Sequence, residues 1–436
     1  MDSFIQSIKN GIQLLINLIK KLIKSLHNNS NSSNKKCEIC DLFDVKCKVK
    51  YFQRNFKNWT SGNNNIDKFI QNAQLSSHVG HEPLEWIPYD RLYDIKYIAR
   101  GGFGKVYRAK WIDGYIDEWD DENQNWKRKG QNKFVALKSL KNSKNVTLEF
   151  MNEVILHHKV NNVFFIIRLY GITKDPETEN LMMVLDYAEN GNLRDYLNKN
   201  HHNLNWRTKI NYLHNIAFGL ELIHEEGLIH RDLHIGNILH MDMEGRNTYI
   251  TDMGLCKPAD YNNNTLEQNC VYGVLPYIAP EILRYQNYTQ AADIYSFGII
   301  IYEIISGLPP YNDVRHDKDL AIKICLGLRP SLNIKVPQII VDLIKRCLDA
   351  DPLNRPSAKE IHRIFEFSDN QGLQIQVDEI EKESINSIPL ITSLSHTSSG
   401  AIYISRLLKF NNLPEPRNSN VTKYSESLQI NVSDKK

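Results

Sequence analysis

The stretch of sequence that decides the fold is His-Arg-Asp-Leu-His-Ile-Gly-Asn-Ile-Leu, at residues 230–239. It holds two polar residues, Asp232 and Asn237, between apolar neighbours. This pattern suits a short loop that carries one proton acceptor and one metal ligand and is closed by a buried strand. Two motifs follow it, Thr-Asp-Met-Gly at 251–254 and Ala-Pro-Glu at 279–281. Their order and domain-scale spacing argue against coincidence, so the three motifs predict one catalytic centre.

Two upstream features suit a nucleotide-binding lobe. Residues 98–106 predict a β-hairpin with a glycine-rich turn, whose backbone amides can approach a triphosphate closely. Alone, this signal fits an ordinary hairpin equally well. Lys138 then ends the apolar run at 135–137. A strand-end lysine is usually a solvated surface residue, but this one lies between the glycine turn and an acid-bearing helix, the order that a phosphate-binding ion pair requires.

Together these motifs resemble a eukaryotic protein kinase, with the closest likeness to the tyrosine-kinase-like serine/threonine group, over residues 93–366. Asp293 resembles the buried aspartate that supports the catalytic loop, and Arg355 resembles the arginine that pairs with Glu281. The resemblance implies an α+β, two-lobed protein kinase fold. Its N-lobe would be a small antiparallel sheet with one main helix, and its C-lobe would be larger and mostly helical.

The resemblance also implies a division of roles within a phosphoryl-transfer site that uses ATP and Mg²⁺ and acts on a protein substrate. Asp232 would accept the proton of the substrate hydroxyl, and Asn237 and Asp252 would bind Mg²⁺. Lys138 would hold the α- and β-phosphates and Glu153 would orient it.

The nucleotide-binding set follows from the same resemblance. Glu153 is preferred to Glu149 as the partner of the lysine because residues 150–153 match the family's helix pattern better. Leu185 would guard the back of the adenine pocket. The residues expected to contact the nucleotide are Gly101, Gly102, Gly104, Val106, Ala136, Lys138, Asp186, Ala188 and Leu239.

Four positions depart from the family pattern. Ala99 replaces the first glycine of the loop, and Met253 replaces the phenylalanine that follows the metal-binding aspartate. His234 replaces a lysine that would reach the γ-phosphate, and Val274 replaces a threonine of the substrate loop. The last two changes leave the choice between hydroxyamino acids open. Because histidine can lose its charge near neutral pH, His234 predicts turnover that depends on pH.

Two classes of function remain. The first is an active protein kinase, most simply a serine/threonine kinase, with a dual-specificity or tyrosine kinase as the alternative. The second is a pseudokinase that binds nucleotide and serves as a scaffold. Pseudokinases usually lack at least one essential residue, whereas this chain retains the full set, so an enzyme is favoured. That set is Lys138, Glu153, Asp232, Asn237 and Asp252.

The amino-acid composition limits the partners and the cellular compartment that can be expected for this protein. The formal net charge of +2 gives no argument for a nucleic-acid partner. The seven cysteines are odd in number and scattered, which fits a reducing compartment better than a disulfide framework. No apolar run reaches the ~18 residues of a spanning helix, so a cytoplasmic protein is expected.

Residues 1–27 form a separate amphipathic segment in which apolar residues recur at spacings of three and four. Lysines occupy the remaining surface of the predicted helix. Three interpretations fit: a helix packed on the kinase domain, a coiled coil, and a basic helix lying on an anionic membrane surface. The last would place the protein peripherally at a membrane.

Residues 28–92 are expected to be a linker with short helices and a cysteine-containing segment. Cys37, Cys40 and Cys47 have part of the spacing of a zinc site, but Lys50 stands where a fourth cysteine belongs. A closed site would need one more ligand, and the nearby histidines are His27, His78 and His81. The alternative is three reduced thiols without a metal.

Two further segments flank or interrupt the kinase-like region. An insertion at about 112–133 predicts an extended hairpin between two strands, with tryptophans that pack within the hairpin or contact a partner. Residues 367–436 are rich in Ser and Asn and are expected to form a mostly disordered tail.

Overall fold

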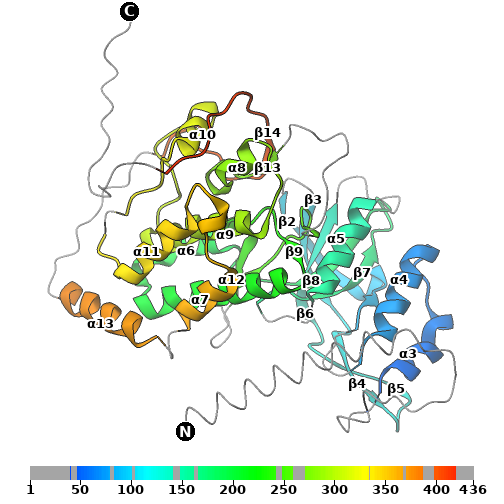
Figure 1. Ribbon diagram of the computed structural model, residues 1–436. Helices are drawn as coiled ribbons and strands as arrows, with labels where there is room; N and C mark the ends of the chain where they lie inside the picture. The colour runs from blue at the N-terminus through cyan, green and yellow to red at the C-terminus, as the bar shows by residue number, and fades with distance from the viewer. Residues whose placement is uncertain are drawn as a thin grey trace, which may run out of the picture. The chain divides into compact units, whose positions relative to one another are not determined.

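The computed structural model describes residues 40, 47–78, 83–100, 104–140, 148–161, 165–241, 248–258, 271–332, 334–366, 370–385 and 397–418 (Figure 1). The helix expected at residues 1–27 lies outside these ranges, as do Gly101 and Gly102. The chain divides into two compact units. One contains the described residues up to Trp86 together with 115–129, and the other contains 87–114 and the described residues from 130 onward.

The larger unit begins with an antiparallel sheet. Its strands lie in the order β7 (Leu169–Lys174), β8 (Leu181–Asp186), β6 (Lys133–Leu140), β3 (Gly104–Trp111) and β2 (Leu92–Arg100). β8 is buried along its first five residues because its sequence there is continuously apolar. One long helix, α5 (Leu148–Lys159), belongs to this lobe. The sheet-rich N-lobe with one main helix, predicted from the sequence, is confirmed.

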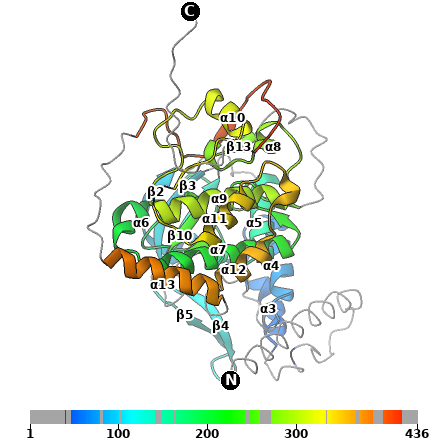
Figure 2. The same cartoon turned by 60° about the vertical axis from the view of Figure 1, so that its left-hand side comes forward.

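The rest of the unit is mostly helical, as the sequence predicted (Figure 2). Asparagine, aspartate or serine side chains cap several helices at their N-termini, which is where these residues satisfy free backbone amides. α9 is buried from Ala292 to Ile305 and forms the centre of the lobe. The helices are α6 (Leu193–Asn200), α7 (Trp206–Glu225), α8 (Pro280–Leu283), α9 (Gln290–Ser306), α10 (Lys318–Cys325), α11 (Gln338–Cys347), α12 (Ala358–Phe365) and α13 (Gln371–Ile385).

Short strands and single turns of 3₁₀ helix connect these helices and shape the loops around the site. The strands pair as β9 (Leu228–Ile229) with β12 (Lys257–Pro258), β10 (Ile238–His240) with β11 (Thr248–Ile250), and β13 (Val271–Gly273) with β14 (Arg406–Leu408). The 3₁₀ turns of this unit are η2 (Tyr89–Arg91), η3 (His201–Asn203), η4 (Ile235–Asn237), η5 (Leu275–Tyr277) and η6 (Pro352–Asn354).

The expectation of a mostly disordered tail is wrong for residues 370–385 and 397–418. The first range forms α13, whose Leu373 and Val377 are buried in the core of the helical lobe. The second carries β14 and buries Leu408 in the same core. Composition averaged over the whole tail hid these apolar residues, which bury enough surface to order their segments.

The smaller unit consists of helices and a hairpin stacked through aromatic side chains. Tyr51 of α3 stacks on Trp119 at 4.4 Å between ring centroids, and Phe52 stacks on Trp126 at 4.4 Å. The tryptophans come from facing strands of the hairpin within the expected insertion, and they also contact each other. The elements are α3 (Val49–Asn55), η1 (Phe56–Asn58), α4 (Asn64–Leu75), β1 (Glu85–Trp86), β4 (Tyr115–Asp120) and β5 (Asn125–Lys129).

Within the described part of the chain, no helix is both long enough and apolar enough to span a membrane.

A buried histidine in α5 should make the protein sensitive to acid. Burial lowers the pKa of His157 from 6.5 to about 4, although its Nε2 lies 2.7 Å from the carbonyl oxygen of Ile167. Between these two values the unfolded chain binds a proton that the folded chain does not. Stability should therefore fall by up to about 3 kcal/mol as pH drops from 6.5 toward 4.

The variant His157→Gln tests this expectation, because glutamine can donate to the same carbonyl and does not titrate. Thermal unfolding followed from pH 7 to pH 4 should lose part of its pH dependence in this variant. His202→Gln, at an exposed position, is the matched control and should follow the parent. Parallel curves for parent and His157→Gln would remove His157 as the source.

Candidate active site

A cluster of three charged side chains joins the sheet, α5 and the segment after β11. Lys138 Nζ lies 2.6 Å from Glu153 Oε1 and 2.7 Å from Asp252 Oδ1. Lys138 lies on β6 and Glu153 on α5, so the pair is formed across the N-lobe. The side chain of Glu149, the other candidate partner, lies outside the described residues.

Within this cluster, Lys138 and Asp252 stabilise each other's ionised forms. Burial alone lowers the pKa of Lys138, but the carboxylates of Asp252 and Glu153 outweigh burial and raise it above its usual value. Burial raises the pKa of Glu153. For Asp252, burial acts in the same direction, but the Lys138 ammonium and the backbone amide of Gly254 lower its pKa overall. The cluster thus presents a charged lysine and an ionised aspartate.

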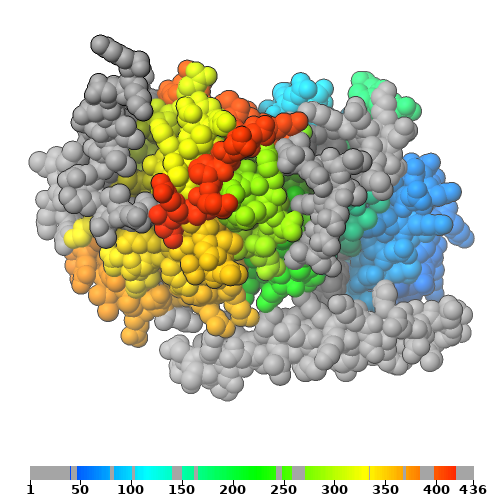
Figure 3. Space-filling view, turned by 45° about the horizontal axis from the view of Figure 1, so that its top comes forward, coloured from blue at the N-terminus to red at the C-terminus, as the bar shows by residue number. Residues whose placement is uncertain are grey.

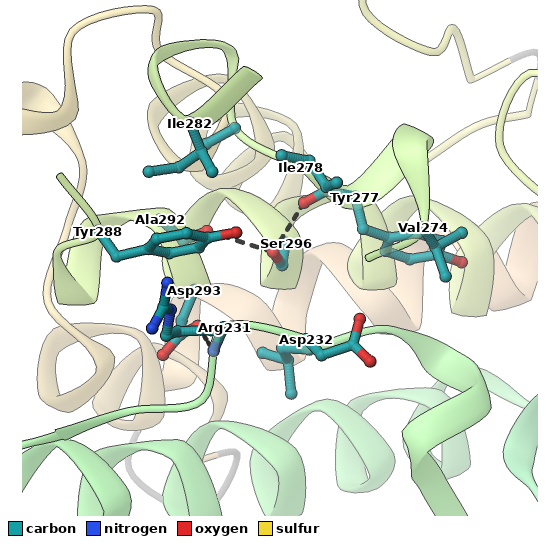
Figure 4. Close-up of a pocket in the computed structure, with 12 residues that line it drawn as sticks. Arg231, Asp232, Val274, Tyr277, Ile278, Ile282, Tyr288, Ala292, Asp293 and Ser296 are labelled. Atoms are coloured by element: carbon teal, nitrogen blue, oxygen red, sulfur yellow. Dashed lines mark hydrogen bonds between the residues drawn. The ribbon is translucent and has the colours of Figure 1, made fainter. Parts of the chain in front are cut away.

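Asp293 of α9 supports the loop before β10 through hydrogen bonds to its backbone. Its two carboxylate oxygens accept hydrogen bonds from the backbone amides of His230, at 2.8 Å, and Arg231, at 2.9 Å. This support was predicted from the sequence and is confirmed. Figure 4 shows Asp293 next to Arg231, whose guanidinium lies 4.1 Å from the centre of the Tyr288 ring. Asp232 points away from them, toward Val274 (Figure 4).

Asn237 is tied both to Asp232 and to the strand that leads to Asp252. Its amide nitrogen donates to the backbone oxygen of Asp232 at 2.9 Å and lies 3.4 Å from Oδ2 of that residue. Its backbone oxygen accepts from the amide of Thr251 at 2.9 Å. These bonds leave the side-chain oxygen of Asn237 without a hydrogen-bond partner among the described residues. An amide oxygen and an ionised carboxylate form a donor set that fits a hard divalent cation.

Two residues of this site have left-handed backbone conformations that non-glycine residues rarely adopt. They are Arg231, with φ 69°, and Asp252, with φ 68°. Each costs of order 1–3 kcal/mol and persists only where the surroundings enforce it. One directly precedes Asp232 and the other is Asp252 itself, so the strain lies at the residues that set the direction of both carboxylates.

The expected nucleotide-binding residues divide between the two lobes. Pairing aligns Val106 with Lys138 on neighbouring strands, and Ala136 with Leu185. Because alternate residues of a strand share a face, Val106 and Ala136 lie on the same face as Lys138. Both are partly exposed, as is Leu239 of β10 in the helical lobe.

The remaining members of that set have defined contacts. Asp186 ends β8 and forms an ion pair with Lys133 at 3.0 Å. The carbonyl oxygen of Ala188 accepts from the amide of Gly191 at 3.1 Å. Gly104 begins β3 and is buried, whereas Gly101 and Gly102 lie outside the described residues.

His234 lies beside Asp232, with 3.8 Å between Nε2 and Asp232 Oδ2. Its Nδ1 accepts from the backbone amide of Gly236 at 3.1 Å, which leaves the ring proton on Nε2. Val274 is buried in the helical core.

The structure adds one residue that the sequence did not predict. Ser405, from the tail, places its hydroxyl 2.6 Å from Asp232 Oδ2 and 3.3 Å from His234 Nε2. The signal available in the sequence was the apolar run at 401–410, Ala-Ile-Tyr-Ile-Ser-Arg-Leu-Leu-Lys-Phe, inside an otherwise polar tail.

A buried ion pair holds Glu281, in the segment that follows β13, against Arg355. Arg355 donates from both terminal nitrogens to Glu281, at 2.7 Å and 2.8 Å, in a two-bond arrangement. It also donates to the backbone oxygens of Asp349 and Ala291. The side chains are 0% and 5% exposed. This pairing was predicted from the sequence and is confirmed.

Comparison with known proteins agrees with this geometry. A family model described as protein tyrosine and serine/threonine kinase matches residues 93–365. A probable serine/threonine-protein kinase of Dictyostelium discoideum is 29% identical over 296 residues, which cover 64% of this chain and 15% of that protein. The serine/threonine-protein kinase VIK of Arabidopsis thaliana is 30% identical over 276 residues, covering 62% of this chain and 58% of that protein.

A putative serine/threonine-protein kinase/receptor of Acanthamoeba polyphaga mimivirus is 28% identical over 299 residues, covering 68% of this chain and 16% of that protein. The matched regions thus span between 15% and 58% of the length of these relatives. The family model covers more than half of the 436 residues and coincides with the two lobes that carry the site. The chain therefore belongs to the protein tyrosine and serine/threonine kinase family.

Proposed function

We propose that this chain is an ATP-dependent protein kinase that transfers the γ-phosphate to serine or threonine hydroxyls of proteins, with Mg²⁺ as the metal. The observation that carries the proposal is the joint presence of two charge arrangements. One is the cluster of Lys138, Glu153 and Asp252, and the other is the pair of Asp232 and Asn237. Phosphoryl transfer depends mainly on positioning and charge neutralisation, which these groups supply.

Each residue has one task in this mechanism. Lys138, held by Glu153, places a positive charge against the α- and β-phosphates. Asp232 orients the acceptor hydroxyl and takes its proton as the oxygen attacks the γ-phosphorus. Asn237 and Asp252 would hold Mg²⁺, which neutralises charge that develops on the phosphates. Val106, Ala136 and Leu239 would provide the apolar walls of the adenine pocket.

The preference for serine or threonine is supported by the reach of Asp232. The hydroxyl now beside its carboxylate is that of a serine, 2.6 Å away. The relatives reported above carry the name serine/threonine-protein kinase, which points in the same direction. A pseudokinase scaffold is less well supported, because the ion cluster and the catalytic loop are both assembled. A radiolabelled-ATP assay on a generic protein substrate, with phosphoamino-acid analysis, tests the proposal.

Label on phosphoserine or phosphothreonine is the expected result. Nucleotide binding without any incorporation would establish the pseudokinase alternative, and label confined to phosphotyrosine would reject the proposed specificity.

Removal of divalent cations should abolish transfer, because the positive charge that the metal would supply at the phosphates is lost. Chelation followed by added Mg²⁺ should restore activity in the parent. Asp252→Asn should require a higher Mg²⁺ concentration and should lose at least ~10² of kcat, because one anionic ligand is gone. Asp313→Asn, an exposed aspartate, is the matched control. Equal Mg²⁺ titrations for Asp252→Asn and parent would contradict the assigned role.

A further inference from the structure

Residues 397–418 cross the surface of the helical lobe as an extended band (Figure 3). β14 in this band pairs antiparallel with β13, so that Gly273 faces Arg406 and Val271 faces Leu408. Leu408 is 3% exposed. The band is thus bound through backbone pairing and through an apolar anchor, two contacts that a peptide uses when it adds a strand to an exposed edge.

Contacts on the other side of Ser405 fix the band as firmly. The ring of Tyr403 lies 4.3 Å from the guanidinium of Arg194, and its hydroxyl donates to the backbone oxygen of Pro310 at 3.0 Å. His316 packs edge-on against the same ring at 4.8 Å, and its amide donates to the backbone oxygen of Gly400 at 3.0 Å. Ser405 is therefore held between two anchored stretches.

The hydrogen bonds of the Ser405 hydroxyl are those expected of a phosphate acceptor before transfer. It donates to Asp232 Oδ2 at 2.6 Å, and because His234 carries its proton on Nε2, the same oxygen accepts from that nitrogen at 3.3 Å. A general base must lie within hydrogen-bond reach of the proton that it removes, and this distance meets that condition.

We propose that residues 401–410 occupy the acceptor-peptide site and that Ser405 is phosphorylated by its own chain. The proposal rests on the kinase function proposed above and names a substrate of the same site. Ser405 Oγ forms a bond to the γ-phosphorus of ATP while the bond from that phosphorus to the β–γ bridging oxygen breaks. The hydroxyl proton passes to Asp232, and the products are phosphoserine and ADP.

Transfer within one chain has a kinetic signature. A tethered acceptor is present at an effective concentration of order mM, whatever the protein concentration. Each molecule should therefore acquire phosphate at position 405 at a rate that does not change when the protein is diluted about tenfold. A reaction between two copies would slow in proportion to the dilution.

Full-length protein incubated with Mg²⁺ and ATP, followed by intact-mass and peptide-mapping mass spectrometry, tests the proposal. One phosphate should map to Ser405, Ser405→Ala should lose it, and Ser398→Ala, in the same band, should keep it. When the active chain is mixed with an Asp232→Asn chain of different mass, the inert copy should remain unmodified at Ser405. Without nucleotide, amide hydrogen exchange at 406–408 should be slow and should accelerate in Leu408→Asp.

The outcomes separate the two proposals. Phosphate on an added protein substrate with none on Ser405 would leave the kinase function standing and overturn the acceptor assignment. Phosphate on the inert copy, or a rate that falls with dilution, would overturn transfer within one chain. Phosphate on no acceptor at all would count against the kinase function itself.

An independent observation in the smaller unit carries a second proposal. The ligand atoms of Cys40, Cys47 and His78 all lie within 4.8 Å of one another, and Cys40 is 2% exposed. His78 follows α4, so the fold brings this histidine back to the two cysteines. Cys40 Sγ lies 3.7 Å from His78 Nδ1. Cys37, the remaining cysteine of the predicted set, lies outside the described residues.

We infer that this cluster binds Zn²⁺, because thiolate sulfur and imidazole nitrogen are the ligands that structural zinc prefers. Full-length protein purified without chelator should contain about one zinc per chain by elemental analysis. Cys40→Ser and His78→Ala should each lose most of it, whereas Cys325→Ala, at a buried cysteine of α10, should retain it. Co²⁺ substitution should give a thiolate charge-transfer band. Zinc-free parent protein that also gives no such band with Co²⁺ would reject the site.

Discussion

Asp232→Asn is expected to lower kcat for an added protein substrate by about 10²–10⁴-fold, the usual contribution of a general base. Asparagine keeps the shape of the side chain and can still accept the hydrogen bonds that reach Asp232 from Asn237 and Ser405. It cannot take a proton. Because the phosphate contacts assigned to Lys138 are untouched, ATP affinity should remain within about twofold of the parent.

Steady-state kinetics and direct nucleotide titration measure the two quantities separately. Asp378→Asn, an exposed aspartate on α13, is the matched control for the loss of one negative charge and should leave both unchanged. An unchanged kcat in Asp232→Asn would remove this residue from the mechanism. A parallel loss of ATP affinity would mean that the change disturbs the loop rather than the proton transfer.

Glu281→Gln is expected to destabilise the protein by about 3–5 kcal/mol, because it leaves the Arg355 charge buried without its partner. The glutamine side-chain oxygen could still accept a hydrogen bond from the guanidinium, but neither this oxygen nor the backbone oxygens of Asp349 and Ala291 carry the negative charge that neutralises it. The contrast is the exposed pair of Arg346 and Glu360, which has the same 2.7 Å separation but side chains that are each 46% exposed. Glu360→Gln should cost about 0–1 kcal/mol, as surface pairs do.

Denaturant titration of both variants and the parent, monitored by intrinsic tryptophan fluorescence, provides the comparison. The prediction depends on burial and not on distance, since the two ion pairs have equal separations. Equal midpoints for Glu281→Gln and Glu360→Gln would show that the buried pair contributes no more than a surface pair.

The motifs to which the proposed chemistry is assigned could be read from the sequence because each is short and locally determined. Asp232 and Asn237 share one loop, and the loop's support from Asp293 follows from a recognisable helix motif. The α+β, two-lobed fold followed from those motifs. The Lys138–Glu153 contact joins neighbouring elements, and their order along the chain suggested it.

The tail could not be placed in the same way. Ser405 and Asp232 are 173 positions apart, and nothing local to Ser405 marks it as a neighbour of the loop. The pairing of β13 with β14 depends on the three-dimensional position of an edge that exists only after the helical lobe has formed. Composition over residues 367–436 averaged the apolar residues of two segments, 370–385 and 397–418, with the polar residues around them and so predicted disorder.

The pairing of β13 with β14 determines which peptides a screen for the recognition motif of the proposed kinase activity could detect. A peptide library screened against the full-length chain would return only the sequences that displace residues 401–410. Their ranking would therefore measure how well each peptide competes with this tethered segment, and not its affinity for an open site. Weak but biologically relevant acceptors would go undetected, since the tethered segment is present at an effective concentration of order mM. A chain lacking the band, or one carrying Leu408→Asp, is therefore the proper bait for such a screen, and inhibitors aimed at the peptide groove should be ranked against both forms.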